Sequence, residues 1–339
     1  MHADSPIQTE TRPQEKYSDL GPVFVKGYSA QLREIQSEKA QGKKSDELAR
    51  VQANALVLLE HKFDSEAYTL LIRAMQIDPR NDLTLRKMYE TCLRLKKYKE
   101  ARSIAAQGMR ESYGFETVIQ NAQIHYILEE DQKSLDLFLE ALSILDHESP
   151  ALFEIYKNMG NICVRLKDFD AAQEYYDKAC TLQPESDVLF VNYGTLEIQR
   201  GCHDKALECF RDAVRVNPRN SKAWVGMAMI HDQRSDFELA WGNVIQAFDF
   251  DENNKTALLL IYQWSKRDHR ELFGKNCLLR FLCEHDRDEE VSLWLTHLCL
   301  SMGQYDEARL EVEKILLFNP AHREAQEIQF ILSERKYSI

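Results

Sequence analysis

Residues 153–184 read FEIYKNMGNICVRLKDFDAAQEYYDKACTLQP, and residues 187–218 read DVLFVNYGTLEIQRGCHDKALECFRDAVRVNP. The second line repeats the first at a constant interval along the chain. The match pairs Gly160 with Gly194, Ala172 with Ala206, Tyr176 with Phe210, Ala179 with Ala213, and Pro184 with Pro218. A fixed period of roughly 34 residues, shared by five positions, is the mark of a repeat architecture.

Each line predicts two helices joined by a short polar break. Small and apolar residues recur with the i, i+3, i+4, i+7 spacing of one helix face at Tyr156, Met159, Gly160 and Cys163. Ala172, Tyr176, Ala179 and Leu182, three or four residues apart, likewise lie on one face of the second helix. Pro184 is expected to end the second helix, because proline has no N–H and restricts the residue before it. Since one such hairpin cannot bury its own apolar face, neighbouring hairpins must stack.

These residues resemble the tetratricopeptide repeat (TPR) family. Its pattern has a small residue late in the first helix, alanine and an aromatic in the second, and proline near the end. The resemblance implies an all-α fold, a right-handed α-solenoid of about eight TPR helix hairpins with capping helices. It is specific for the fold and not for the function, because such arrays serve many unrelated roles.

The repeat pattern extends over most of the chain, residues 48–322. The predicted repeats lie near 48–81, 82–114, 115–148, 153–186, 187–220, 221–254, 255–288 and 289–322. A four-residue insertion, residues 149–152, precedes the fourth repeat. Residues 323–339 predict one C-terminal capping helix with apolar Ile328, Ile331 and Leu332 and a polar outer face.

The N-terminal part lacks the repeat. Residues 23–47 predict a capping helix and a linker, with a break at 42–45 and Ser45 as the next N-cap. Residues 1–22 are polar and show no periodicity, which predicts either a disordered tail or a segment that lies in the protein's own groove.

Composition excludes several classes of function. The net charge of −12 argues against nucleic acid or an anionic membrane as the main partner. No apolar run is long enough for a membrane-spanning helix, and the first residues have no secretory signal pattern. The eight cysteines lack the dense spacing of a disulfide scaffold, so we expect reduced thiols and a cytoplasmic protein.

No catalytic motif is present, so the sequence predicts neither an enzyme nor a cofactor. Cysteine and histidine gather near the C-terminus at Cys277, Cys283, His285, His297 and Cys299. Their spacing does not match a zinc site, whose successive ligands usually lie two to four residues apart. We therefore expect no metal.

The resemblance also indicates a binding surface. In the TPR family the first helix of each repeat lines a concave groove that holds an extended peptide. Carried onto this sequence, the groove positions are Arg86, Arg94, Gln123, Tyr126, Lys157, Asn161, Arg165, Asn192, Lys222, Lys266 and Trp294. This basic, amide-rich strip favours an acidic or carboxylate-bearing peptide. The chain is therefore interpreted as a non-catalytic protein–protein interaction scaffold or adaptor that binds an extended or helical, acidic segment of a partner.

An alternative is a chaperone adaptor that holds a C-terminal carboxylate. TPR co-chaperones of this type use a clamp of lysine, asparagine and arginine residues in consecutive repeats. Lys157, Asn161, Asn192 and Lys222 match that clamp in type and spacing, whereas its final place is Gly226 instead of arginine.

Three further hypotheses remain open. The chain can be the recruiting subunit of an enzyme complex whose catalyst is a separate polypeptide. Its N-terminal tail can occupy the groove as autoregulation. A homodimer can form through apolar surface of the degenerate seventh repeat, at Trp264, Leu272, Phe273 and Phe281.

Overall fold

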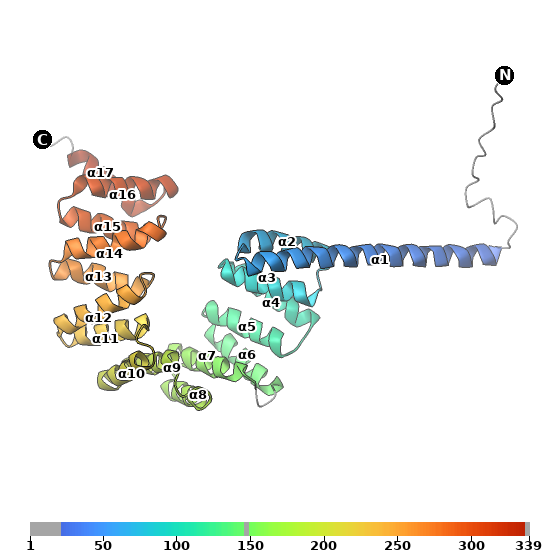
Figure 1. Cartoon of the computed structure of the whole chain (residues 1–339), viewed down its shortest axis with the longest axis horizontal. Coiled ribbons are helices and arrows are strands. Elements are labelled where there is room, and N and C mark those ends of the chain that lie inside the picture. The colour runs from blue at the N-terminus through green and yellow to red at the C-terminus, as the bar shows by residue number, and fades with distance from the viewer. Residues whose placement is uncertain (1–21, 146–148, 336–339) are drawn as a thin grey trace, which may run out of the picture. The chain divides into compact units, whose positions relative to one another are not determined.

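The computed structural model describes residues 22–145 and 149–335, with side chains for residues 41–145 and 149–333. The described residues form seventeen helices and no strand (Figure 1). The predicted all-α solenoid is confirmed. The chain divides into two compact units, residues 1–145 (unit 1) and 146–339 (unit 2). The predicted tail, residues 1–22, lies outside the described residues except for its last residue.

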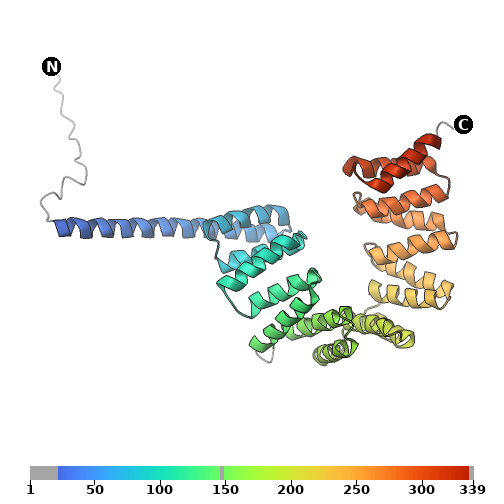
Figure 2. The same ribbon diagram turned by 180° about the vertical axis from the view of Figure 1, so that it is seen from behind.

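Consecutive helices pack as antiparallel hairpins in both units (Figures 1 and 2). Unit 1 contains α1 (Pro22–Glu60), α2 (Asp64–Ile77), α3 (Asp82–Arg94), α4 (Tyr98–Glu111), α5 (Phe115–Ile127) and α6 (Asp131–Ile144). Unit 2 begins with α7 (Ala151–Arg165), α8 (Phe169–Leu182), α9 (Asp187–Gln199), α10 (His203–Val216), α11 (Ser221–Gln233) and α12 (Phe237–Phe250). It continues with α13 (Lys255–Arg267), α14 (Glu271–Glu284), α15 (Glu289–Ser301), α16 (Tyr305–Phe318) and α17 (Arg323–Arg335). In each hairpin the odd-numbered helix is the first helix and the even-numbered helix the second.

Small residues let the two helices of a hairpin approach closely, as the sequence predicts. A Cβ atom on Gly160 in α7 would collide with the ring of Tyr176 in α8. Ala172 and Ala179 of α8 are fully buried, and Tyr176 is 2% exposed. The large aromatic therefore fills the space that the small residues leave.

The turn inside each hairpin has one residue in the left-handed region. These residues are Lys62, Lys96, Glu129, Lys167, Gly201, Ser235, His269 and Gly303, with φ between 54° and 77°. From Lys167 onward they follow one another at a constant interval, so the backbone marks the repeat where the residue type does not. The following N–H closes the turn on the end of the first helix, as in the bond from Asp168 N to Cys163 O at 2.9 Å.

Polar side chains begin the first helices at the same period. Ser186, Asn220, Asn254 and Asp288 each accept a hydrogen bond from the backbone N–H three residues later. The second helix α8 ends at Leu182 before Pro184, as expected for a residue that cannot continue a helix.

The insertion at 149–152 is divided between a loop and a helix. The α7 helix has 15 residues, whereas α5 and α9 have 13, so two inserted residues lengthen its first turn. The remaining residues lengthen the connection between Ile144 and Ala151, of which residues 146–148 lie outside the described part.

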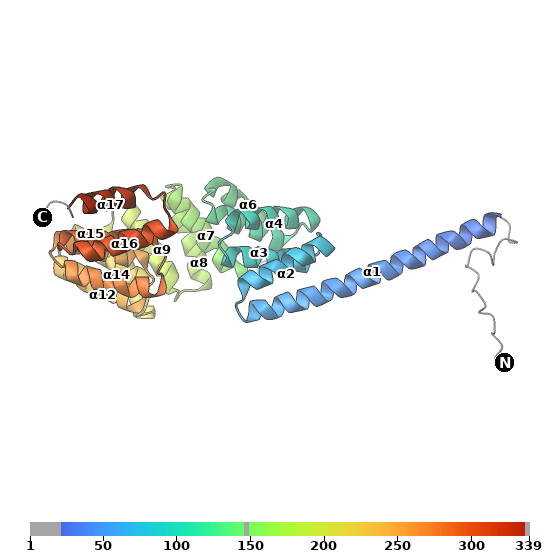
Figure 3. The ribbon, with the colours of Figure 1, turned by 90° about the horizontal axis from the view of Figure 1, so that it is seen from above.

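The predicted break at 42–45 is wrong. The α1 helix runs through Gly42 and Ser45 without interruption, so the capping helix and the first repeat share one helix (Figure 3). Gly42 has no positive φ and nothing within 4 Å of its Cβ position, so the backbone does not use its conformational freedom there. One exposed glycine costs a helix only about 1 kcal/mol, which does not break it without a competing turn.

Two expectations about exposed apolar surface need correction. Ile328 and Leu332 of α17 are buried, but Ile331 is 56% exposed beside Phe330 at 62%, so the outer face of α17 is not wholly polar. In the seventh repeat, Trp264 and Phe281 are buried in the core; Leu272 and Phe273 are exposed. Across the described residues, no helix combines the length and apolar character needed to cross a membrane.

Candidate functional site

The first helices of unit 2 form the surface on which the sequence places most groove residues. Helix α9 contacts both α7 and α11, and α13 contacts α15. Asn161, Asn192 and Lys222 therefore lie on three first helices that follow one another in space. What this surface can bind depends on the partners that these side chains already have within the chain.

A hollow of about 540 Å³ opens between α9, α11 and the start of α13. Its floor is apolar and consists of Val191, Ile198, Phe210, Val225 and Met229. Its polar wall includes Lys222, Asp251, Asn253, Asn254 and Lys255. Such a combination of an apolar floor and a few polar groups is typical of binding sites.

Phe210 reaches the hollow from α10, a second helix, because two glycines make room for its ring. A Cβ atom would lie 2.6 Å from Cε1 of Phe210 if built on Gly194, and 2.7 Å if built on Gly226. The ring is 2% exposed and is held between α9 and α11. At Gly226, the clamp position where the resemblance expects arginine, the space of a side chain is therefore filled by a buried aromatic ring.

The amides at the start of α13 are held in place by the protein. Asn254 accepts from Ala257 N–H at 3.1 Å and donates from Nδ2 to Ser221 Oγ at 2.7 Å. Asp251 accepts from Asn253 N–H at 3.0 Å. These bonds hold the wall of the hollow in place.

The two lysines of the hollow differ in their partners. Lys255 lies 2.8 Å from Asp288 and 3.1 Å from Glu290. Burial lowers the pKa of Lys255, but its bonds to these two carboxylates outweigh burial, so the pKa is raised overall. Lys222 is exposed, and within the described part of the chain its ammonium group has no acceptor. The positive charge available to a ligand is therefore that of Lys222.

The other predicted clamp residues have partners or are partly buried. Lys157 lies 2.5 Å from Glu154. Asn161 accepts a hydrogen bond from the hydroxyl of Tyr176 at 2.8 Å. The Nδ2 group of Asn192 is buried, with no acceptor among the described residues. Arg165, a groove position outside the clamp, is exposed at the end of α7.

In unit 1 the predicted groove cations are paired within the chain. Arg86 lies between Asp82, at 2.6 Å, and Glu116. Arg94 lies 3.2 Å from Asp64 on the preceding second helix. Gln123 and Tyr126 of α5 are half-buried. The basic strip that the sequence predicts is thus largely neutralised in this unit, because the acidic residues near it were not counted: Asp82 in the same helix, and Asp64 and Glu116 in neighbouring hairpins.

A second cluster joins α13, α15 and α17. The rings of Tyr262 and Trp294 stack with centroids 5.6 Å apart, and Lys266 lies 5.5 Å from the centre of the Tyr262 ring. His297 lies 3.1 Å from the Tyr262 hydroxyl and 3.2 Å from Glu324. Burial lowers the pKa of His297 despite Glu324. Of this cluster, the predicted site includes Lys266 and Trp294 but not Tyr262.

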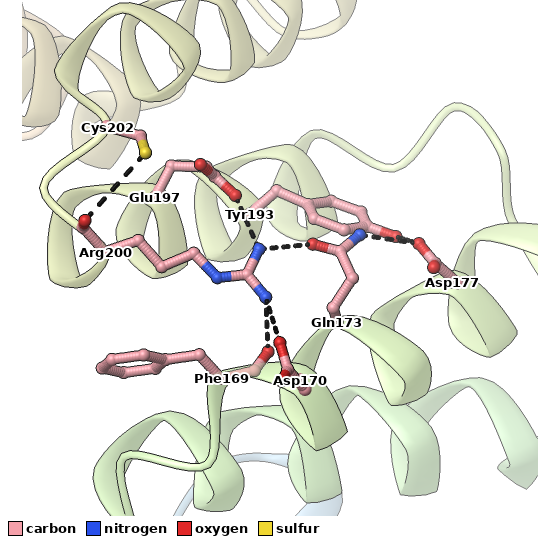
Figure 4. A network of polar contacts seen from close by, with 8 residues as sticks. All are labelled: Phe169, Asp170, Gln173, Asp177, Tyr193, Glu197, Arg200 and Cys202. Carbon is pink, nitrogen blue, oxygen red and sulfur yellow. Dashed lines mark hydrogen bonds and ion pairs between the residues drawn. The ribbon is translucent and has the colours of Figure 1, made fainter.

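Arg200 connects α9 to the preceding hairpin (Figure 4). Its guanidinium donates to Phe169 O at 2.8 Å, Gln173 Oε1 at 3.1 Å and Glu197 Oε1 at 3.0 Å. Beside it, the Tyr193 hydroxyl donates to Asp177 at 2.6 Å. Burial, and to a smaller extent this bond, raises the pKa of Tyr193. The network fixes the end of α9 against α8, and so it fixes the wall of the hollow that Ile198 and Gln199 line.

Sequence reasoning missed the hollow itself. It treated Phe210 as a packing position equivalent to Tyr176, and it treated Gly226 only as a missing arginine. The signal was available in the spacing, since Gly226 lies one helical turn after Lys222. The sequence does not show that the Phe210 ring, from a different helix, fills the space of the side chain that Gly226 lacks.

Comparison with known proteins supports the repeat. Residues 116–185 match a family model described as "Tetratricopeptide repeat". The chain is 24% identical over 140 residues to the BBSome complex member BBS4 of Bos taurus, which is 41% of this chain and 26% of that protein. It is 38% identical over 77 residues to small glutamine-rich tetratricopeptide repeat-containing protein 2 of Mycosarcoma maydis, or 23% of this chain and 22% of that protein. The matches thus span about a quarter of each relative.

The fold is also found among solved structures. Yeast Tom70 superposes with a TM-score of 0.63 over 81% of this chain and 59% of its own, at 17% identity. This likeness concerns the fold alone. The helix hairpins, the regular spacing of their turns and the family match lead to one conclusion: the chain contains tetratricopeptide repeats, matched over residues 116–185, within an all-α solenoid.

Proposed function

We propose that the chain is a non-catalytic scaffold or adaptor that binds an acidic segment of a partner protein across the first helices of unit 2. The TPR fold is a general scaffold for protein interaction. The observation that carries the proposal is Lys222, an exposed cation without an acidic partner in the described residues, above an apolar hollow. A carboxylate of the partner supplies the charge that the chain itself does not.

Several observations support the scaffold interpretation. The relative from Bos taurus is named as a member of a complex, the BBSome. Burial raises the pKa of the Cys163 and Cys277 thiols to about 11, which disfavours the thiolate that a cysteine nucleophile needs. We place the protein in the cytoplasm, in keeping with eight free cysteines. The recruiting role in an enzyme complex is compatible with the same surface.

Peptide display on the intact chain tests the proposal. A random peptide library is selected against the immobilised protein, and recovered peptides are titrated by fluorescence anisotropy. We expect enrichment of aspartate and glutamate. Lys222→Glu is expected to weaken the selected peptides by about tenfold or more, with the remaining affinity less dependent on salt.

Lys205→Glu is the matched control, because Lys205 is exposed on α10 and does not line the hollow. The same charge change there leaves the affinity unchanged. Recovery of no peptide, or equal effects of the two variants, contradicts the proposed function.

A chaperone adaptor is the second candidate. It is favoured by the order of Lys157, Asn161, Asn192 and Lys222 along α7, α9 and α11. This candidate requires a free C-terminal carboxylate on the ligand. Amidation of that carboxylate abolishes binding if the clamp operates, and leaves it unchanged if an internal segment is bound.

Two hypotheses concern the chain's own surfaces. Removal of residues 1–22 raises the affinity for selected peptides if the tail occupies the groove, and leaves it unchanged otherwise. Exposed Leu272 and Phe273 are the apolar residues of the seventh repeat that remain available to a homodimer. Analytical ultracentrifugation of a Leu272→Glu variant tests this association.

A further inference from the structure

We infer that the hollow of unit 2 selects a partner segment in which one acidic residue lies close to one large apolar side chain, within an internal stretch of the partner chain. The inference rests on the proposed function and specifies its ligand. It depends on Gly226, on the Phe210 ring beneath it and on the distribution of charge around Lys222.

The position of Gly226 separates this surface from a two-cation clamp. Lys222 and Gly226 are four residues apart on α11, so they lie about 6 Å apart along the helix axis on one face. A carboxylate placed near Gly226 would find no guanidinium on that residue. Because a desolvated carboxylate without a donor is unfavourable, this place disfavours a second negative charge.

The floor beside Gly226 suits an apolar side chain. Phe210, Val191 and Val225 are all buried and form a fixed surface. Met229 is 38% exposed at the open side of the hollow, and its flexible thioether can adapt to the shape of a ligand. A phenylalanine, leucine or methionine of the partner that packs against Met229 would remove the exposed part of Met229 and its own apolar surface from water.

The charges leave room for one carboxylate. Lys255 is already shared by Asp288 and Glu290, and Asp251 accepts from the N–H of Asn253. Lys222 forms no ion pair within the described residues, Asp251 included. A single acidic residue of the partner therefore neutralises Lys222, whereas a run of acidic residues would be repelled by the carboxylate of Asp251.

The spacing of the two features sets the spacing in the ligand. In an extended segment, residues i and i+2 point to the same side and lie about 7 Å apart. This distance is close to the rise of about 6 Å between Lys222 and Gly226. The acidic and the apolar residue are therefore expected two positions apart.

The experiment is the same display selection, carried out in parallel on the intact chain and on two variants. Wild-type protein is expected to recover peptides in which an acidic residue and a large apolar residue are two positions apart. Met229→Gln keeps the acidic preference and lowers the affinity gained from the apolar residue by about tenfold. Lys222→Gln keeps the preference for the apolar residue and lowers the affinity gained from the acidic residue by about tenfold. Both changed side chains are exposed, so the fold is retained.

Leu239→Gln on α12 is the control for Met229→Gln, since Leu239 is 55% exposed and does not line the hollow. It leaves both preferences unchanged. Recovered peptides that are acidic but show no apolar preference overturn this inference and leave the proposed function standing. Peptides without acidic enrichment, or no peptides, overturn both.

Discussion

The ring of Phe210 occupies the place that a side chain on Gly226 would need, since a Cβ atom there would lie 2.7 Å from its Cε1. Phe210 belongs to α10 and Gly226 to α11, so this contact joins two neighbouring hairpins. The ring leaves no space for a clamp side chain at residue 226, and it forms part of the floor of the hollow. Packing between repeats and the chemistry of the candidate binding surface are therefore linked at one position.

Gly226→Ala is expected to destabilise unit 2 by about 2 kcal/mol, because the buried ring must leave its position. Urea denaturation followed by circular dichroism measures this loss. Gly242→Ala is the matched control: Gly242 lies in α12 with nothing within 4 Å of its Cβ position. There alanine gains about 0.5–1 kcal/mol from helix propensity.

A double-mutant cycle checks the cause. If the ring is responsible, Gly226→Ala combined with Phe210→Leu loses less stability than the sum of the two single changes. Additive losses would mean that Gly226 matters for a reason unrelated to Phe210.

Replacing a left-handed turn residue by glycine is expected to stabilise the protein. Lys167 has a φ of 63° and is exposed, so its side chain adds strain without packing. Lys167→Gly is expected to raise the free energy of unfolding by about 0.5–1 kcal/mol. This value is the backbone strain that glycine relieves, minus the stability lost because glycine gives the unfolded chain more conformational entropy.

Gly201→Ala provides the opposite change at the equivalent position, where φ is 77°. It lowers the free energy of unfolding by about 1 kcal/mol. Thermal denaturation of both variants compares them directly. A loss of stability in Lys167→Gly would show that chain entropy outweighs backbone strain in these turns.

Arg200→Ala is expected to cost about 2 kcal/mol, because it leaves the backbone carbonyl of Phe169 and the carboxylate of Glu197 without their donor. The side chain of Glu197 is only 9% exposed. The local effect is measured by hydrogen exchange at the amides of α8 and α9.

Arg234→Ala is the matched control. Arg234 occupies the equivalent position one repeat later and pairs with Asp204, whose side chain is 91% exposed. Since exposed ion pairs contribute little, its removal is expected to cost less than about 1 kcal/mol. Equal costs at the two positions would argue against the role given to the buried contacts of Arg200.

Stability of unit 1 is expected to fall as the pH decreases through the range of histidine titration. Burial lowers the pKa of His125, and the bond to Glu130 only partly offsets this effect; Lys133 and Arg102 lower it further. Because the unfolded chain then binds the proton more readily, stability is fully present above a pH of about 6.5 and is lost toward the folded pKa.

Urea denaturation at a series of pH values measures this slope, to which one group contributes at most about 1.4 kcal/mol per pH unit. His125→Gln cannot titrate and is expected to flatten the curve. Parallel curves for the variant and the native protein would assign the pH dependence to other groups.

The repeat fold followed from residues whose roles are local. The alternation of helix and turn, the small residues at 160, 172 and 179, and Pro184 each act within one hairpin, so their pattern can be read along the chain. The uninterrupted α1 was not predicted, because glycine and serine at 42–45 resemble a turn in the sequence although the helix continues. Six of the eight left-handed turn residues were also missed, since they are not glycine.

The sequence by itself determined the helical repeat, its constant period and the helices that carry Lys157, Asn192 and Lys222. Only the tertiary structure decided which of the predicted groove groups already have partners within the chain. Among the predicted groove cations, Arg94 pairs with Asp64 of the preceding hairpin, whereas Lys222 lines the hollow together with Phe210. The reason is physical: the helical period is a property of neighbours in sequence, whereas charge pairing and the filling of space depend on residues from adjacent helices and repeats that meet only when the hairpins stack.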